Sequence, residues 1–177
     1  MPMSFKDYWS TFVWNKKSIL DKLYMFSIAN LVVIPLSLIF FFWLKDQQGC
    51  PYGKNGFIYL DIVWNTSGAF GAFSNNFVAI LVIQSLCSVG VFIVTIFVRE
   101  RSYLFLLYIV LLGGLFNLIQ RPCINNAVLD YFHFGFWKEF AVFNMPDVMV
   151  VTGGFGLVIN VFISVIFPRK AKKNVKN

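Results

Sequence analysis

Charged side chains and metal-binding side chains are both scarce in this sequence. Only 13% of the 177 residues are Asp, Glu, Lys or Arg, and the chain has a single His and three Cys. The cysteines, Cys50, Cys87 and Cys123, are widely separated, and no pair of residues has the spacing of metal ligands. We therefore expect no metal ion and no other cofactor. The basic residues also lack the pattern of a nucleic-acid-binding groove, so we expect no nucleic acid partner.

Apolar residues dominate the composition instead. They make up 58% of the chain, and the mean hydropathy of +0.70 is far above that of a soluble domain. Four apolar runs contain no charged residue, and each has close to the roughly 20 residues that cross a bilayer core: Met25–Leu44, Phe77–Val98, Tyr103–Ile119 and Val148–Phe167. The sequence predicts an all-α integral membrane protein with four transmembrane helices in one domain, residues 25–167, without a separate soluble module.

The basic residues predict how the helices are oriented. Eleven of the fifteen would lie on one side of the membrane: Lys6, Lys16, Lys17, Lys22, Arg99, Arg101, Arg169, Lys170, Lys172, Lys173 and Lys176. The side with the excess of Lys and Arg is usually cytoplasmic, so we expect both termini in the cytoplasm, with a basic tail at 168–177. The net charge of +7 then reflects this orientation and contact with anionic lipids.

The N-terminal segment, residues 1–24, has an amphipathic pattern. Phe5, Tyr8, Trp9 and Phe12 recur at helical spacing, whereas the lysines fall on other faces. This pattern predicts an amphipathic helix on the cytoplasmic leaflet that breaks near Asn15; a loosely ordered basic tail is the alternative. We do not expect the first apolar run to be a cleavable signal peptide, because it is too long and has no small-residue cleavage site.

The predicted topology leaves two long outer loops, 45–76 and 120–147. In the first, Phe57–Trp64 is rich in aromatic and β-branched residues and predicts a strand. We interpret this loop as a small β-structured extracytoplasmic flap on the outer leaflet. The second loop is dense in aromatic residues between Tyr131 and Phe143. These residues could form an interfacial aromatic belt or line a lipid-facing substrate channel.

Two aspartates, Asp130 and Asp147, fall near the outer ends of predicted helices. Carboxylates at a membrane boundary are costly and are often retained for chemistry, and two that meet can form an acid/base pair. Asn144 has the form of a helix cap, with Asp147 at the third helical position. We expect Asp147 to be the charged base there, although it could merely stabilise the helix N-terminus. Asp130 has apolar neighbours and is expected to carry the shared proton.

Four sequence elements resemble, in order, motifs of the lipoprotein signal peptidase (signal peptidase II) family. Asn65-Thr66-Ser67-Gly68-Ala69-Phe70 is similar to N-x-G-x-A-F, and Asn117-Leu118-Ile119-Gln120-Arg121 to N-x-x-D-R. Val128-Leu129-Asp130-Tyr131 is similar to V-x-D-F, and Phe143-Asn144-Met145-Pro146-Asp147 to F-N-x-A-D. Ser67, Gln120 and Pro146 depart from these motifs. An aspartate that the family carries in its first helix is missing, and Asn30 lies in that region.

The resemblance implies a bacterial aspartic endopeptidase of the cell membrane that cuts lipidated prolipoproteins just before the diacylglyceryl-modified cysteine. Asp130 and Asp147 would be catalytic, at the outer face. Asn65, Asn117, Arg121 and Asn144 would orient the pair or the substrate; Arg121 alone could instead extend to the interface. We expect a monomer that contacts membrane lipids.

A non-enzymatic membrane assembly or transport subunit is the alternative. Transport pathways usually contain ionisable groups inside the membrane, and the four apolar runs contain none. The glycine pairs Gly113-Gly114 and Gly153-Gly154 indicate close helix packing more readily than a site.

Overall fold

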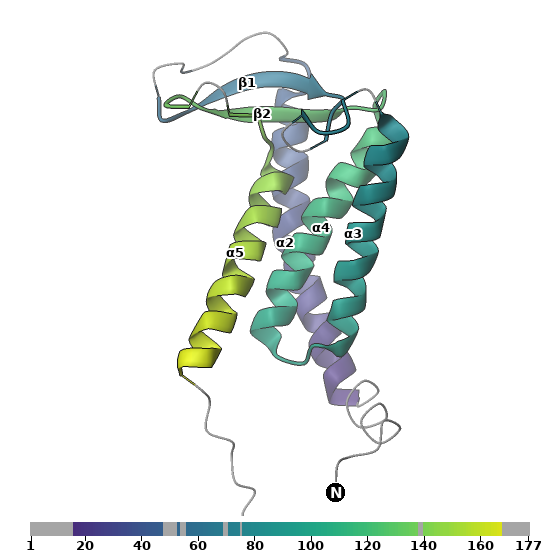
Figure 1. The fold of residues 1–177 in the computed structure, drawn as a ribbon, viewed down its shortest axis with the longest axis vertical. Helices are drawn as coiled ribbons and strands as arrows, with labels where there is room; N and C mark the ends of the chain where they lie inside the picture. Colours follow the sequence, from purple (N-terminus) through teal and green to yellow (C-terminus); the bar gives the residue numbers. More distant parts are fainter. Residues whose placement is uncertain are drawn as a thin grey trace, which may run out of the picture.

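The computed structural model describes residues 16–47, 53, 56–68, 71–74, 76–137 and 140–167. Within these ranges, four long helices stand side by side and a two-stranded sheet lies across one end of them (Figure 1). The elements are α2 (Lys16–Leu44), β1 (Ile58–Asn65), α3 (Phe77–Phe97), α4 (Arg101–Cys123), β2 (Val128–Phe134) and α5 (Met145–Ile166). All four helices are long and apolar enough to cross a membrane. Each predicted apolar run thus falls on one helix.

The helices extend beyond the apolar runs at several ends. α2 begins at Lys16 and not at Met25, so residues assigned to the N-terminal segment continue the first long helix. α4 continues to Cys123, which corrects the prediction that the second outer loop begins at residue 120. Hydropathy identifies only the apolar part of each helix. A helix can continue beyond that part where its polar residues form hydrogen bonds or ion pairs. The predicted amphipathic helix before Asn15 and the basic tail at 168–177 lie outside the described residues.

α4 is the centre of the bundle and packs against α2, α3 and α5. Its most extensive contact is with α5, where glycines allow a close approach. A Cβ atom on Gly113 would lie 2.8 Å from the Pro146 carbonyl oxygen, and one on Gly153 would lie 2.7 Å from Val110 Cγ2. The prediction that the two glycine pairs serve helix packing is therefore confirmed for Gly113 and Gly153, whereas a Cβ atom on Gly154 would meet nothing within 4 Å. The outward faces of the helices carry exposed large apolar side chains, as expected where lipid surrounds them.

The sheet forms at the end where α2 and α4 finish and α3 and α5 begin (Figure 1). β1 matches the predicted strand to within one residue, whereas β2 was not predicted. The strands are antiparallel, with Val63 opposite Asp130, and a bulge separates Leu60 from Val63. An apolar cluster fixes the sheet to the end of α2; it contains Leu44, Ile62, Leu129 and Tyr131.

Phe143 pairs with the free edge of β2. Its N–H donates to the Phe132 carbonyl (2.9 Å), and its carbonyl accepts the N–H groups of Tyr131 (3.1 Å) and Phe132 (2.7 Å). The Tyr131 hydroxyl also accepts the Met145 N–H at 2.9 Å. These contacts fasten the start of α5 to β2, and they bring the surroundings of Asp130 and Asp147 together.

Candidate active site

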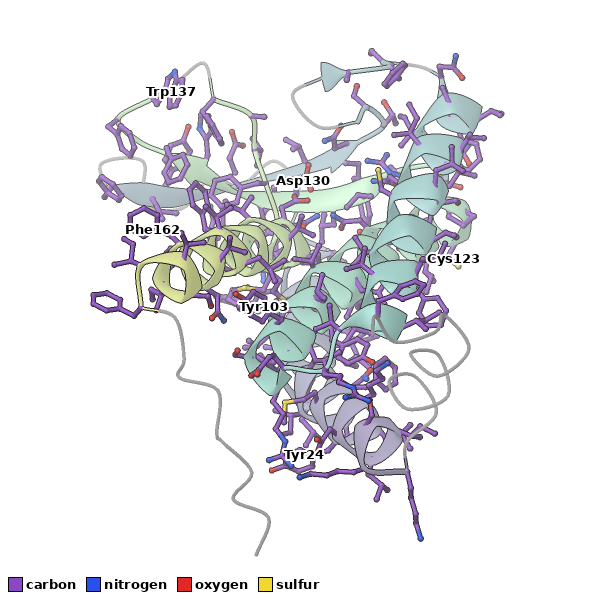
Figure 2. All side chains as sticks on the ribbon, turned by 60° about the horizontal axis from the view of Figure 1, so that its bottom comes forward. Tyr24, Tyr103, Cys123, Asp130, Trp137 and Phe162 are labelled. Carbon is purple, nitrogen blue, oxygen red and sulfur yellow. The ribbon has the colours of Figure 1, made fainter. Side chains whose placement is uncertain are left out.

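Asp130 lies on a strand, β2, and not at the mouth of a helix. After α4 ends, Asn125 and Asn126 adopt left-handed backbone conformations with φ of 46° and 63°, which Asn tolerates better than most residues. The Asn126 N–H donates back to the Arg121 carbonyl at 3.0 Å, so the chain reverses sharply into β2. Figure 2 shows Asp130 beside the sheet, between α5 on one side and α3 and α4 on the other.

Asp147 lies in the first turn of α5. Asn144 is the N-cap: its side-chain oxygen accepts the Asp147 N–H (2.9 Å), and Asp147 Oδ2 accepts the Asn144 N–H (3.0 Å). This reciprocal pair is a capping box, and Pro146 occupies the first turn. The predicted cap, proline and third helical position are all confirmed. The helix N-terminus therefore fixes the position of the Asp147 carboxylate.

Three asparagine side chains donate to the two carboxylates, and two of them, Asn117 and Asn144, connect the pair. Asn65 Nδ2 donates to Asp130 Oδ2 (2.8 Å), and Asn144 Nδ2 donates to Asp130 Oδ1 (2.8 Å). Asn117 Nδ2 donates to Asp147 Oδ1 at 2.7 Å. Asn144 Nδ2 also lies 3.1 Å from Asn117 Oδ1, so a continuous path of hydrogen bonds joins the aspartates. Every carboxylate oxygen of the pair accepts a hydrogen bond from an amide.

Arg121 is 4% exposed and holds the segment after β1. Its guanidinium donates to the carbonyl oxygens of Asn65 (3.3 Å) and Ser67 (2.7 Å). The alternative for Arg121, extension to the membrane interface, does not hold for this buried side chain. Asn65 Oδ1 accepts the Ser67 N–H (2.8 Å), and a Cβ on Gly68 would approach the Ala72 carbonyl to 2.9 Å. Arg121 thus acts on Asp130 through Asn65, and its positive charge is close enough to favour the ionised form of Asp130.

Asp130 is the more buried carboxyl, with 3% of its surface exposed. Burial raises the pKa of Asp130 to about 7, and the nearby Asp147 carboxylate adds to this rise. The hydrogen bonds from Asn65 and Asn144 and the charge of Arg121 act in the opposite direction. Because burial outweighs these effects, Asp130 can hold a proton at neutral pH.

Both carboxylates line a cavity of about 430 Å³. Its polar lining includes Asn65, Gln84, Asn117, Arg121, Asn144 and Thr152, so all four residues that the resemblance implied as supporting the pair are present. The aromatic second loop contributes Phe134, Phe140 and Phe143 to the apolar wall, whereas Phe136 and Trp137 are exposed. The loop therefore has cavity-lining and outward-facing aromatic residues, and Trp137 is at the edge of the molecule in Figure 2.

Two features of this site were not anticipated from the sequence. Gln120 accepts the Leu129 N–H through Oε1 (3.2 Å) and thereby attaches α4 to β2. Gln84 reaches the cavity from α3; a single amide in an apolar run gives little signal. Asn30 does not reach the pair: its Nδ2 donates to the Phe26 carbonyl of its own helix (2.8 Å).

Comparison with known structures identifies the same fold. Two solved structures, each described as a bacterial membrane enzyme studied by the in meso method, superpose with TM-scores of 0.62 and 0.57. The first alignment covers 90% of this chain and 94% of the other, and the second 81% and 91%. Sequence identity is 17% and 16%, so the likeness is one of fold.

Sequence comparison is more specific. The curated lipoprotein signal peptidases of Mycoplasmoides gallisepticum (strain R(low / passage 15 / clone 2)) and Malacoplasma penetrans (strain HF-2) are 34% identical over 152 residues and 33% identical over 131 residues. The alignments cover 78% and 67% of this chain but 49% and 55% of the relatives, so the chain spans about half their length. The profile of Peptidase_A8, described as signal peptidase (SPase) II, matches residues 38–163. With most of its length matched and the two aspartates joined at one cavity, the chain belongs to the signal peptidase II family.

Proposed function

We propose that this protein is an aspartic endopeptidase that removes signal peptides from lipidated prolipoproteins in a bacterial membrane. The observation that carries the proposal is the pair Asp130 and Asp147, which come from different elements, are joined by asparagines and face one cavity. Family membership supports the same activity. An assembly or transport subunit would have no evident need for two such linked carboxylates.

The catalytic step follows from the different surroundings of the two carboxyls. Asp130 holds the shared proton, because burial and the Asp147 charge raise its pKa to about 7. Asp147, held by the capping box, takes a proton from a water molecule that attacks the scissile carbonyl. Asp130 donates its proton to the carbonyl oxygen, which gives a tetrahedral intermediate. As the C–N bond breaks, Asp147 passes the proton that it took from water to the departing amine, and Asp130 takes a proton back from a hydroxyl of the intermediate. Asn65, Asn117 and Asn144 keep the carboxylates oriented, and Arg121 positions Asn65.

The place of the site in the bundle suits this substrate. A signal peptide spans the membrane, and the acyl chains of the modified cysteine lie in one leaflet, so the scissile bond lies near a membrane boundary. Asp130 and Asp147 lie where the helices meet the sheet (Figure 1). The distribution of Lys and Arg supports an orientation with this end outside and the termini in the cytoplasm. One chain contains both carboxylates, which suits a monomer.

A processing assay with purified protein tests the proposal. The substrate is a prolipoprotein whose cysteine carries a diacylglyceryl group, with an unlipidated form of the same sequence as the control. The wild type should cleave the lipidated form, and Asp130→Asn and Asp147→Asn should each lose activity while remaining folded in the membrane. Near-normal turnover by either variant would rule out the aspartic mechanism, and retained assembly without any cleavage would favour a non-enzymatic role.

A further inference from the structure

Gln84 is a polar residue within the apolar helix α3. It is the α3 residue among the described lining of the active-site cavity, which it shares with both catalytic-pair carboxylates. Gln84 follows the N-cap Asn76 by eight residues, which at 1.5 Å per residue places it about 12 Å along the helix from that end. The amide therefore lies inside the membrane-spanning part of the site.

The side-chain oxygen of Gln84 has no hydrogen-bond partner within the described part of the chain. Oε1 is buried and accepts no hydrogen bond from any described residue. A buried acceptor without a donor costs about 1–3 kcal/mol, and an apolar side chain at this position would avoid that cost. On the opposite wall, Thr152 donates its hydroxyl hydrogen to the Val148 carbonyl of its own helix at 2.7 Å. Among the described residues that line the cavity, Gln84 therefore has a buried acceptor without a donor.

A peptide substrate supplies the missing donor. The segment that enters a peptidase site must be extended, so its backbone N–H and C=O groups lose their helical partners. The walls around Gln84 are largely apolar and include Phe134, Val142 and Val151, so they provide few replacement partners in a region without bulk water. A side-chain amide has an acceptor and two donors, which complement a peptide group.

We propose that Gln84 binds the backbone of the signal-peptide segment just before the scissile bond, with Oε1 accepting one peptide N–H. This role rests on the proposed peptidase function and adds a substrate-positioning residue to it. Because the contact is to backbone, it aligns the extended segment with Asp130 and Asp147 without selecting a particular side chain. The orphaned oxygen is the feature that a purely structural glutamine would lack.

The test combines a variant with a backbone-modified substrate. Gln84→Met keeps the length of the side chain and removes its polar atoms. Ser88→Ala is the matched control: Ser88 is one turn further along α3 and faces α4, its Oγ lying 3.8 Å from where a Gly114 Cβ would be. The substrates are the all-amide lipidated peptide and five versions with a single ester in place of one of the five amides that precede the scissile bond. Each ester removes one N–H.

In the wild type, one ester position should lower kcat/KM about tenfold, which corresponds to one lost hydrogen bond in a site without bulk water. Gln84→Met should lose about the same factor on the all-amide peptide and become insensitive to that ester, because the two changes remove the same contact. Ser88→Ala should match the wild type. Thermal unfolding should show Gln84→Met at least as stable as the wild type, since a buried unpaired oxygen is removed.

Two results would overturn the inference: wild-type kcat/KM for Gln84→Met on the all-amide peptide, or full sensitivity of that variant to every ester. Either can occur while the wild type cleaves normally, which leaves the peptidase function intact. Absence of cleavage by the wild type would instead reject the proposed function, and the inference with it.

Discussion

Asn144 Nδ2 donates to Asp130 Oδ1 at 2.8 Å and so joins the N-terminus of α5 to the carboxylate on β2. The same residue caps α5, exchanging two hydrogen bonds with Asp147. Asn144 is 1% exposed, so its side-chain amide is shielded from solvent. The geometry of both carboxylates therefore depends on one side chain that has a capping role and a donor role.

These two roles can be separated by substitution. Asn144→Ser keeps a capping hydroxyl but has no amide to donate to Asp130. We expect a thermal unfolding midpoint close to that of the wild type and a kcat lower by about a hundredfold, an effect comparable to losing one oriented donor in an active site. Asn76→Ala is the control, since Asn76 caps α3 through the Ala79 N–H and contacts neither aspartate. A kcat for Asn144→Ser within a few-fold of the wild type would show that the Asp130 contact is dispensable.

The pKa of Asp130 predicts a pH limit on activity. Because this pKa is raised to about 7, the proposed acid loses its proton as the pH rises through 7. We expect kcat/KM to fall about tenfold per pH unit on the alkaline side. Initial rates on the lipidated substrate between pH 5 and 9 measure this limb, whose apparent pKa belongs to the coupled pair. A rate that stays constant to pH 9 would contradict the assignment of Asp130 as the acid.

Infrared spectra of two variants test which carboxyl holds the proton. At about pH 6, the band of a protonated carboxyl should disappear in Asp130→Asn and persist in Asp147→Asn. In the second variant the Asp130 pKa should fall, because the neighbouring negative charge that raises it is lost, but burial remains. The band should therefore titrate at lower pH than in the wild type. The reverse pattern would assign the proton to Asp147.

The sequence predicts the α5 end of the site well because its signals are local. Asn144, Pro146 and Asp147 lie within one turn, and each has a preference for that position. The strand that carries Asp130 has no such signal. Val128–Phe134 is buried on both faces over most of its length, so it lacks the alternation that identifies a half-buried strand. Its partner β1 lies more than 60 residues earlier in the chain, and the pairing is visible only after folding.

The end of α4 was misplaced for a different reason. Gln120, Arg121 and Pro122 interrupt the apolar run, so hydropathy ends the helix near Ile119. In the structure Gln120 and Arg121 bond to the sheet and to the segment after β1, and Pro122 falls in the last turn. Polar partners from distant parts of the chain therefore extend the helix beyond its apolar part. Gln120 stands where the family motif has an aspartate, and its side-chain oxygen still accepts a hydrogen bond from the Leu129 N–H.

The contact of Gln120 with Leu129 makes a testable contribution to the site. Gln120→Leu removes the acceptor for a buried N–H next to Asp130, so we expect faster hydrogen exchange at Leu129 and about tenfold lower activity. Gln120→Glu keeps an oxygen at the same distance along the side chain and should preserve the exchange protection. The test is the exchange rate of the Leu129 amide in the wild type and in both variants, measured by mass spectrometry or NMR. Equal protection in all three proteins would show that the strand does not need this bond.

Gly153 and Gly154 of α5 allow a direct test of helix packing, because these two adjacent glycines have different surroundings. A Cβ on Gly153 would lie 2.7 Å from Val110 Cγ2 and 3.1 Å from the Leu106 carbonyl oxygen, whereas one on Gly154 would meet nothing within 4 Å. Gly153→Ala should therefore push α5 away from α4, at a cost of about 1–3 kcal/mol, and lower the unfolding midpoint in detergent by several degrees. It should also reduce activity, because the same helix pair carries Asn117 and Asp147, and Asp147 precedes Gly153 by only six residues on α5. Gly154→Ala should leave the midpoint unchanged or raise it, since Ala favours the helix. Equal unfolding midpoints for the two variants would mean that α4 and α5 can move apart at little cost in stability. The close approach at Gly153 would then not hold the carboxylates in place.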